Sequence, residues 1–200
     1  MAAIRSICVY CGSSPGSNPV YMEAGRALGQ AIAEAGLRLV YGGGTRGIMG
    51  AVAAATREHG GKVMGIIPTF LMNKEATQAG LSQLDELVVT ENMHERKHRM
   101  FEESDAFVAL PGGIGTVEEI VEIMTWAQLG RHRKPIVYAN INGFWNPMLA
   151  LLEHMKGEGF VHTSHLVAPL VVNEASGIVA AILTHQPAAT AGEPAVIERM

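Results

Sequence analysis

Short apolar runs rich in β-branched residues alternate along the chain with longer segments whose apolar residues recur at helical spacing. Segments such as 20–35 and 117–129 have the period of amphipathic helices. Strands that alternate with helices predict βαβ crossovers and a parallel sheet. The expected fold is a three-layer, Rossmann-like α/β sandwich around a central, mainly parallel sheet of about seven strands. The predicted strands are 6–10, 38–41, 62–67, 86–90, 106–110, 135–139 and 166–172.

Two of these runs are apolar without interruption, Ile7–Val9 and Phe107–Leu110. Such runs are typical of parallel strands that are buried on both faces. A chain of 200 residues with 48% hydrophobic side chains is long enough for one well-buried core. We therefore predict a single domain over residues 1–185. Residues 186–200 are rich in Ala, Pro, Thr, Gly and Glu without an apolar face, and predict a flexible C-terminal tail.

The formal net charge of -4 and the isoelectric point near 6.1 leave no broad basic surface. Binding to nucleic acid or to an anionic membrane is therefore not expected. No segment approaches the roughly 18 apolar residues of a membrane-spanning helix, and the first residues lack the pattern of a signal peptide. With only Cys8 and Cys11, a cytoplasmic protein is expected. Their C-x-x-C spacing does not indicate redox chemistry, because Cys8 lies within a predicted strand rather than at a helix N-terminus.

Three glycine-rich turns follow predicted strands: Cys11–Ser14 (CGSS), Gly42–Gly47 (GGGTRG) and Pro111–Thr116 (PGGIGT). In an open parallel sheet, ligands bind beyond the carboxyl ends of the strands. Glycine lets an anion approach the backbone, and a following helix adds unpaired N–H groups and its positive dipole end. For any one of these turns, a tight bend without a ligand is an equally good explanation. Three turns at one sheet edge favour a phosphate site.

Residues 42–47 also match G-x-G-x-x-G, so a dinucleotide-binding enzyme is an alternative. That fingerprint is expected after the first strand, with an acidic residue at the end of the next one. Here the next strand ends in Ile66-Ile67-Pro68, without an acid. No Gly-Lys-Ser/Thr follows any of the turns, which also argues against a Walker phosphate-binding loop.

Charged residues gather on a predicted helix over 92–105 and at the start of the helix after the third turn. Arg96 and Lys97 are a natural clamp for phosphate or ribose oxygens, although a solvated face paired with nearby glutamates is the alternative. Thr116 and Glu119 fit a capping box, which would give Glu119 a structural role. Glu118 would then face the sugar, where a carboxylate stabilises an oxocarbenium-like centre or activates water.

Two further signals are weaker. Glu75 is another acid near a predicted strand end, although its position also fits ordinary surface. His94 and His98 have the i,i+4 spacing of a metal pair, but no second group of ligands with suitable spacing occurs elsewhere. We therefore expect no metal.

The segments Met93–Met100 (MHERKHRM) and Pro111–Glu119 (PGGIGTVEE) together resemble the paired motifs of the Lonely Guy family of cytokinin-activating phosphoribohydrolases. The resemblance extends through CGSS, YGGG, MGIIP and TWAQLG and covers roughly residues 5–180. It implies a hydrolase without metal or cofactor, usually dimeric, that acts on adenosine 5′-monophosphate or its N6-prenylated derivatives. Members were long labelled lysine decarboxylases, but no lysine here has a pyridoxal-binding context.

The resemblance implies catalytic roles for Arg96, Glu118 and Glu119, and leaves open which glutamate acts. The loop between Glu75 and Arg96 is a few residues longer than in plant members, which makes the transfer of a substrate role to Glu75 less secure. Ile114 stands where the family commonly has tyrosine, so base preference stays open. Together with the glycine turns, the candidate substrate-binding residues are Gly12, Ser13, Gly43, Gly44, Glu75, Lys97, Gly112, Gly113, Ile114, Gly115, Thr116 and Thr125.

The function that we predict is hydrolysis of the N-glycosidic bond of a nucleoside 5′-monophosphate, giving a free base and ribose 5-phosphate. The alternative is a non-catalytic nucleotide or cofactor carrier of the same fold. A carrier would keep the glycine turns but would not need Arg96, Glu118 and Glu119. A DNA-processing protein of related fold is disfavoured by the acidic charge balance.

Overall fold

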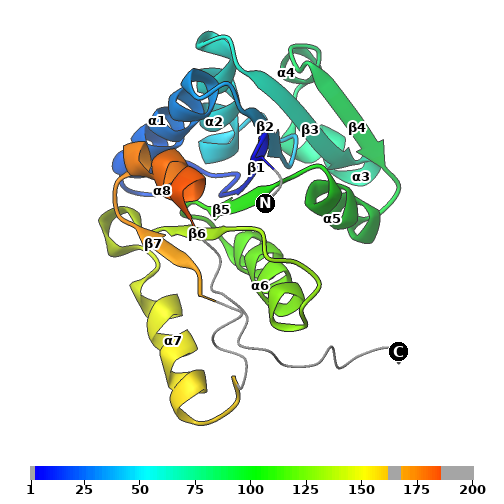
Figure 1. Ribbon diagram of the computed structural model, residues 1–200. Coiled ribbons are helices and arrows are strands. Elements are labelled where there is room, and N and C mark those ends of the chain that lie inside the picture. The colour runs from blue at the N-terminus through cyan, green and yellow to red at the C-terminus, as the bar shows by residue number, and fades with distance from the viewer. Residues whose placement is uncertain (1–2, 162–167, 186–200) are drawn as a thin grey trace.

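The computed structural model describes residues 3–161 and 168–185 (Figure 1). The predicted tail, 186–200, and the first two residues of the predicted last strand lie outside the described residues. The described part contains one sheet in the order β4-β3-β2-β1-β5-β6-β7, with every neighbouring pair parallel. The predicted parallel sheet is confirmed. Its strands are β1 (Ser6–Tyr10), β2 (Arg38–Tyr41), β3 (Lys62–Pro68), β4 (Glu86–Thr90), β5 (Ala106–Ala109), β6 (Ile136–Ala139) and β7 (Leu170–Val172).

Helices cover both faces of the sheet, which completes the predicted three-layer, Rossmann-like sandwich. In Figure 1, α1, α2 and α8 lie on one face, and α5 and α6 lie on the other. No helix in the described ranges is long and apolar enough to cross a membrane. The helices are α1 (Val20–Glu34), α2 (Gly47–Glu58), α3 (Thr69–Glu75), α4 (Gln78–Leu81), α5 (Met93–Glu102), α6 (Ile114–Gln128), α7 (Asn146–Gly157) and α8 (Ile178–Thr184), with short 3₁₀ turns η1 (Ile141–Gly143) and η2 (Ala175–Gly177).

The central strand β1 shows why an apolar run in the sequence predicts a buried strand. Its side chains alternate between the two faces, and every one of its residues is buried. Ile7 and Val9 pack in the core beneath α1 and α2, while Cys8 and Tyr10 pack in the core beneath α5 and α6. Because both faces are covered, residues Ile7 to Val9 are all apolar instead of alternating with polar residues.

The strand order places the turns after β1 and β5 beside each other. The chain runs outward from β1 through β2 and β3 to β4, and then returns to the other side of β1 to form β5, β6 and β7. Such a reversal opens a crevice at the carboxyl ends of the two central strands, which is the usual ligand position in this type of sheet. Here the Gly12 N–H donates to the Pro111 carbonyl (3.1 Å) and ties the first glycine turn to the third.

Candidate active site

The three glycine turns meet at one edge of the sheet, as predicted, and they do so through backbone contacts. A Cβ at Gly112 would run into the side chain of Thr116 and lie 2.9 Å from the Gly12 nitrogen. Gly47 has a φ of +57° and packs against the backbone of Ser13. Gly43 has a φ of +75°, and a Cβ there would lie 2.9 Å from that of Ile67. Larger residues would push the turns apart.

The helices that follow the second and third turns differ at their N-termini. At α2, the N–H groups of Ile48 and Met49 donate to the Gly12 carbonyl (3.1 and 3.3 Å), so the protein itself occupies that end. At α6, no acceptor within the described ranges pairs with the N–H groups of residues 114–116. A Cβ at Gly113 or Gly115 would meet open space. An anion therefore fits the N-terminus of α6 and not that of α2.

The predicted capping box at Thr116 and Glu119 is wrong. Helix α6 begins at Ile114 with Gly113 as its N-cap, so Thr116 is the third helical residue and not the cap. Thr116 is buried against Gly112, and Glu119 belongs to the second turn of the helix. The sequence pattern fits the motif, but the chain enters the helix one turn earlier, with the extended residue Gly113 as its N-cap. Glu119 is thereby freed from the structural role that the pattern implied.

A side-chain cap is found instead at the start of α5. The Asn92 side chain accepts a hydrogen bond from the Glu95 N–H (2.9 Å), and the Glu95 carboxylate accepts one from the Glu91 N–H (2.9 Å). The first bond satisfies a donor that the helix leaves unpaired in its first turn, and the second ties the residue before the cap to the helix. They define where α5 begins and hence where Arg96 lies.

Arg96 and Glu119 form a buried ion pair between α5 and α6. The Arg96 Nη1 atom lies 3.2 Å from Glu119 Oε1, with only 7% and 10% of the two side chains exposed. Arg96 Nε donates to the Ile66 carbonyl (3.1 Å) and Nη2 to the Gly42 carbonyl (3.4 Å). The two carbonyls, which the sequence did not reveal as partners, orient the guanidinium at the ends of β2 and β3.

Burial raises the pKa of Glu119 from 4.5 to about 7. The positive charge of Arg96 opposes that rise, while the negative charges of Glu118 and Glu75 add to it. Desolvation disfavours the ionised form of a buried carboxyl group, and here it outweighs the ion pair. Glu119 is therefore poised to exchange a proton near neutral pH, which suits a general base.

Lys97 and Glu118 form a second bridge between the same helices, outside the first. The Lys97 Nζ atom lies 2.5 Å from Glu118 Oε1 and 3.2 Å from Glu122 Oε1. Burial lowers the pKa of Lys97, but hydrogen bonds to Glu118 and Glu122 outweigh it, so that the pKa is raised. The Lys97 ammonium is thus engaged by carboxylates. Sequence reasoning missed Glu122, although it is four residues after Glu118 on the same helix face.

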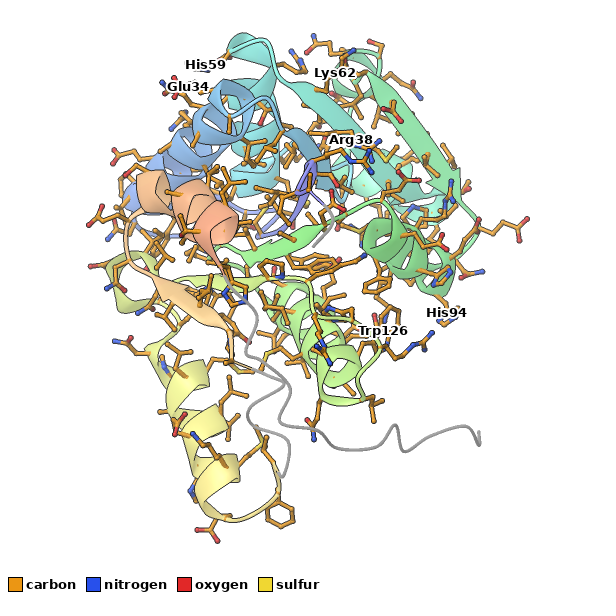
Figure 2. The ribbon with its side chains drawn as sticks, viewed as in Figure 1. Glu34, Arg38, His59, Lys62, His94 and Trp126 are labelled. Atoms are coloured by element: carbon orange, nitrogen blue, oxygen red, sulfur yellow. The ribbon has the colours of Figure 1, made fainter. Side chains whose placement is uncertain are left out.

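The alternative for the charged helix, a solvated face paired with nearby glutamates, describes residues further along α5. Arg99 pairs with Glu102 and Glu103, and His98 pairs with Glu102, all through exposed or half-exposed side chains. Figure 2 shows α5 and α6 with their side chains, with His94 and Trp126 labelled on this side of the sheet. Arg96, by contrast, is buried among carbonyls and a carboxylate.

Glu75 is the last residue of α3, and the structure brings it to the second glycine turn. Its carbonyl accepts a hydrogen bond from the Thr45 N–H (2.9 Å) and lies 3.6 Å from the position that a Cβ at Gly44 would occupy. Its charge contributes to the raised pKa of Glu119. Glu75 therefore belongs to the same cluster of charges, although it is far from Glu119 in the sequence.

Ile114 and Thr125 occupy different parts of α6. Ile114 stands at the open N-terminus with 86% of its surface exposed, beside the predicted phosphate position. Thr125 donates to the Val121 carbonyl (2.8 Å) and lines an apolar groove between α6 and α7. Among the described residues, no hydrogen bond joins Thr125 to Arg96 or Glu119.

The two cysteines are free and buried, as the strand assignment implied. Burial raises the pKa of Cys8 to about 12, even though a hydrogen bond involving Tyr10 lowers it. Burial also raises the pKa of Cys11. The raised pKa disfavours the thiolate form of both cysteines at neutral pH.

Comparison with protein families and curated proteins gives a consistent set of relatives. A family model described as possible lysine decarboxylase matches residues 49–182. A probable cytokinin riboside 5′-monophosphate phosphoribohydrolase of Oryza sativa subsp. japonica is 47% identical over 161 residues, 80% of this chain and 70% of that protein. The cytokinin riboside 5′-monophosphate phosphoribohydrolase of Rhodococcoides fascians is 44% identical over 179 residues, 89% of each protein.

Solved structures with a similar fold are more distant in sequence. The molybdenum cofactor binding protein of Rippkaea orientalis has a TM-score of 0.66 at 20% identity, and covers 91% of this chain and 97% of that one. The molybdenum cofactor carrier protein of Chlamydomonas reinhardtii has a TM-score of 0.66 at 22% identity, over 90% and 96% of the two chains. At this level of identity, the likeness shows the fold alone.

Proposed function

The chain belongs to the family of the cytokinin riboside 5′-monophosphate phosphoribohydrolases, and from this membership we propose that it hydrolyses the N-glycosidic bond of a nucleoside 5′-monophosphate. The products are a free base and ribose 5-phosphate. The substrates that we propose are adenosine 5′-monophosphate and its N6-prenylated derivatives. The protein is an enzyme, because its relatives at 44–47% identity are phosphoribohydrolases.

The 5′-phosphate binds at the N-terminus of α6. Support comes from the N–H groups of residues 114–116, which have no acceptor in the part of the chain that the structure describes, and from the open space beside Gly113 and Gly115. The glycines let the phosphate oxygens approach the backbone, and the helix dipole favours the negative charge. The ribose then lies toward Glu119, one turn further along the same helix.

The single observation that carries the mechanism is the buried Arg96–Glu119 pair. As the C1′–N bond breaks, positive charge develops on the ribose ring, and the Glu119 carboxylate stabilises it. The same carboxylate accepts a proton from the attacking water, whose oxygen bonds to C1′. The base leaves with the electrons of the C1′–N bond and takes up a proton from solvent, and Glu119 later returns its proton to solvent. A pKa of about 7 gives Glu119 an appreciable ionised fraction at neutral pH. Arg96 positions this carboxylate and favours its ionised form.

The alternative, a carrier protein, has less support. The carriers of the same fold are only 20–22% identical to this chain, while the phosphoribohydrolases reach 44–47%. A carrier needs a complementary pocket but not a carboxyl group with its pKa near neutrality. The Arg96–Glu119 pair therefore favours the hydrolase.

The test is product analysis by liquid chromatography. The protein is incubated with AMP, N6-isopentenyl-AMP, GMP and CMP, and with adenosine as the substrate that lacks a phosphate. We expect free base and ribose 5-phosphate from the adenine nucleotides, much less base from adenosine, and none from the Glu119→Gln variant. Nucleotides that bind without releasing base would support the carrier instead, and equal turnover of adenosine would remove the phosphate site.

We also propose that the protein is a homodimer that joins through the groove between α6 and α7. This groove encloses about 620 Å³ and is lined mainly by apolar side chains, while Leu151 on α7 and Val171 on β7 leave nearly half of their surfaces in solvent. An apolar surface of this kind favours a protein partner, and self-association fits the resemblance to dimeric enzymes. Light scattering should give a dimer that Val121→Asp converts to a monomer, while Leu183→Asp, at an exposed position on α8, leaves it intact. A monomeric wild type would end the proposal.

We further propose a cytoplasmic location. The two cysteines, Cys8 and Cys11, are both free and buried in the structure, which suits a reducing compartment. Fractionation of host cells would test this, and recovery outside the cytoplasm would contradict it.

A further inference from the structure

Helices α5 and α6 are joined by two parallel sets of ion pairs, and only the inner set belongs to the proposed chemistry. Arg96 and Lys97 are consecutive on α5, and Glu118 and Glu119 are consecutive on α6. The inner pair, Arg96–Glu119, is buried, with 7% and 10% of the side chains exposed. The outer pair, Lys97–Glu118, is extended by Glu122 and reaches solvent, with 51% of the Glu118 side chain exposed.

We propose that Lys97, Glu118 and Glu122 form a positioning cluster that holds α5 against α6 and keeps Arg96 opposite Glu119. The proposal rests on the proposed function, in which Glu119 is the reacting carboxylate. It assigns Glu118 to positioning and not to catalysis, and it gives Glu122 a role that its place in the sequence did not suggest.

Geometry separates the two adjacent glutamates. Glu118 Oε1 lies 2.5 Å from the Lys97 ammonium, and half of the side chain is in water. The Glu118 carboxylate is thus already bound to a cation, and it lies outside the buried pair. Glu119 is almost completely buried, and burial favours proton uptake. Of the two, Glu119 is therefore the one suited to accept a proton from water.

The arrangement of Lys97 explains why a single residue can anchor the helices. Its ammonium is within 3.2 Å of carboxylates one turn apart on α6, so both glutamates hold the same point of α5. Only 16% of the Lys97 side chain is exposed, so solvent competes weakly for these bonds. Rotation of either helix about its axis would break both contacts, and would also carry Arg96 away from Glu119.

The cluster also sets the charge around Glu119. The ionisable groups that face Glu119 are Arg96 and Lys97 from α5, Glu118 from α6, Glu75 from the end of α3, and Cys8, Tyr10 and Cys11 from β1 and the turn after it. The charge of Glu118 raises the pKa of Glu119, and the charge of Lys97 lowers it. Removal of Lys97 and removal of Glu118 should therefore change the ionisation of Glu119 in opposite directions.

The experiment measures this ionisation directly. Proteins labelled with ¹³C at the glutamate carboxyl carbon are titrated by NMR, and the Glu119 signal is identified by its loss in Glu119→Gln. Relative to the wild type, we expect Lys97→Met to raise the Glu119 midpoint, because it removes both a positive charge and the contacts that keep Arg96 in place. We expect Glu118→Gln to lower the midpoint, because glutamine removes a negative charge but still accepts a hydrogen bond from Lys97, which Glu122 also holds. Each shift should be on the order of half a pH unit. Lys97→Arg should restore the wild-type midpoint. The acidic limb of kcat/KM against pH with AMP should move with the midpoints.

The matched control is Lys62→Met. Lys62 pairs with Asp85 at the start of β3, at the opposite end of that strand from the Ile66 carbonyl that binds Arg96 (Figure 2). Its substitution removes a lysine ion pair without touching the cluster. It should leave both the Glu119 midpoint and the activity profile as they are in the wild type.

The outcomes separate this proposal from the function on which it rests. If Lys97→Met shifts the Glu119 midpoint no more than Lys62→Met does, or if Lys97→Arg does not restore it, the cluster does not act on Glu119. If Glu118→Gln abolishes base release at every pH while the Glu119 midpoint stays in place, Glu118 is itself catalytic. If the wild type releases no base, the proposed function fails, and the NMR midpoints still decide the role of the cluster.

Discussion

Replacement of Glu119 by glutamine should change how the stability of this protein depends on pH. Burial raises the pKa of Glu119 from 4.5 to about 7. Between these two values the folded protein keeps a proton that the unfolded chain releases. The free energy of unfolding therefore falls as the pH rises through this interval. Below pH 4.5 the contribution of Glu119 is fully present, and it is lost once the pH has passed about 7.

The size of the effect follows from the difference between the two values. About 2.5 pKa units at about 1.4 kcal/mol each give about 3 kcal/mol. Glu119 is 9% exposed, so no large correction for solvent screening applies. Glutamine has nearly the same shape as the protonated acid but does not titrate. The variant should match the wild type best at pH 4.5 and become more stable than it, by about 3 kcal/mol, above pH 8.

Urea unfolding followed by circular dichroism, repeated from pH 4.5 to 8.5, measures this difference. Subtracting the two curves removes the contribution of every other titrating group that the proteins share. Glu153→Gln is the matched control, because Glu153 is an exposed helical glutamate that pairs with Lys156. It reports what the loss of an exposed carboxylate does to the same measurement.

Two results would refute the reasoning. Parallel curves for Glu119→Gln and the wild type would mean that the pKa of Glu119 is the same in the folded and unfolded states. A variant that loses stability relative to the wild type as the pH rises would mean that Arg96 lowers that pKa overall, so that the ion pair outweighs burial.

Further substitutions test the geometry of the site. Arg96→Met leaves Glu119 buried without its cation, which should cost about 3–5 kcal/mol of stability at pH 8. The cost should be smaller at pH 5, where Glu119 is protonated, and urea unfolding at the two pH values measures both. An equal loss at pH 5 and pH 8 would contradict an interaction between Arg96 and the ionised Glu119. The same variant should release no base in the chromatographic assay, and full activity would remove Arg96 from the mechanism. Gly112→Ala should lower the free energy of unfolding by about 1–3 kcal/mol, because the added methyl group meets Thr116. In Gly113→Ala the methyl group meets open space, and the free energy of unfolding should change by less than about 1 kcal/mol. Equal losses in urea unfolding would show that the turn is not packed as described.

The fold could be predicted from the sequence alone because the relevant signals are local. Strands β1 and β5 are buried on both faces and were recognisable as unbroken apolar runs. The glycine turns stood out by composition, and alternation of strands with helices limited the possibilities to a parallel sheet. The paired motifs around Arg96 and Glu119 also sufficed to indicate the family, which comparison with curated relatives then confirmed.

Tertiary structure decided which residues meet, because those contacts depend on how helices rotate and pack. Thr116 and Glu119 match a capping box in sequence, but α6 starts earlier, after Gly113, and Glu119 lies in the core. No local pattern predicts whether Arg96 or Lys97 on α5 pairs with Glu119 on α6. The packing of both helices on the sheet buries Arg96 with Glu119 and leaves Lys97 with Glu118 at the surface. Since burial sets the pKa of a carboxyl group, the fold, and not the sequence pattern, distinguishes the two glutamates.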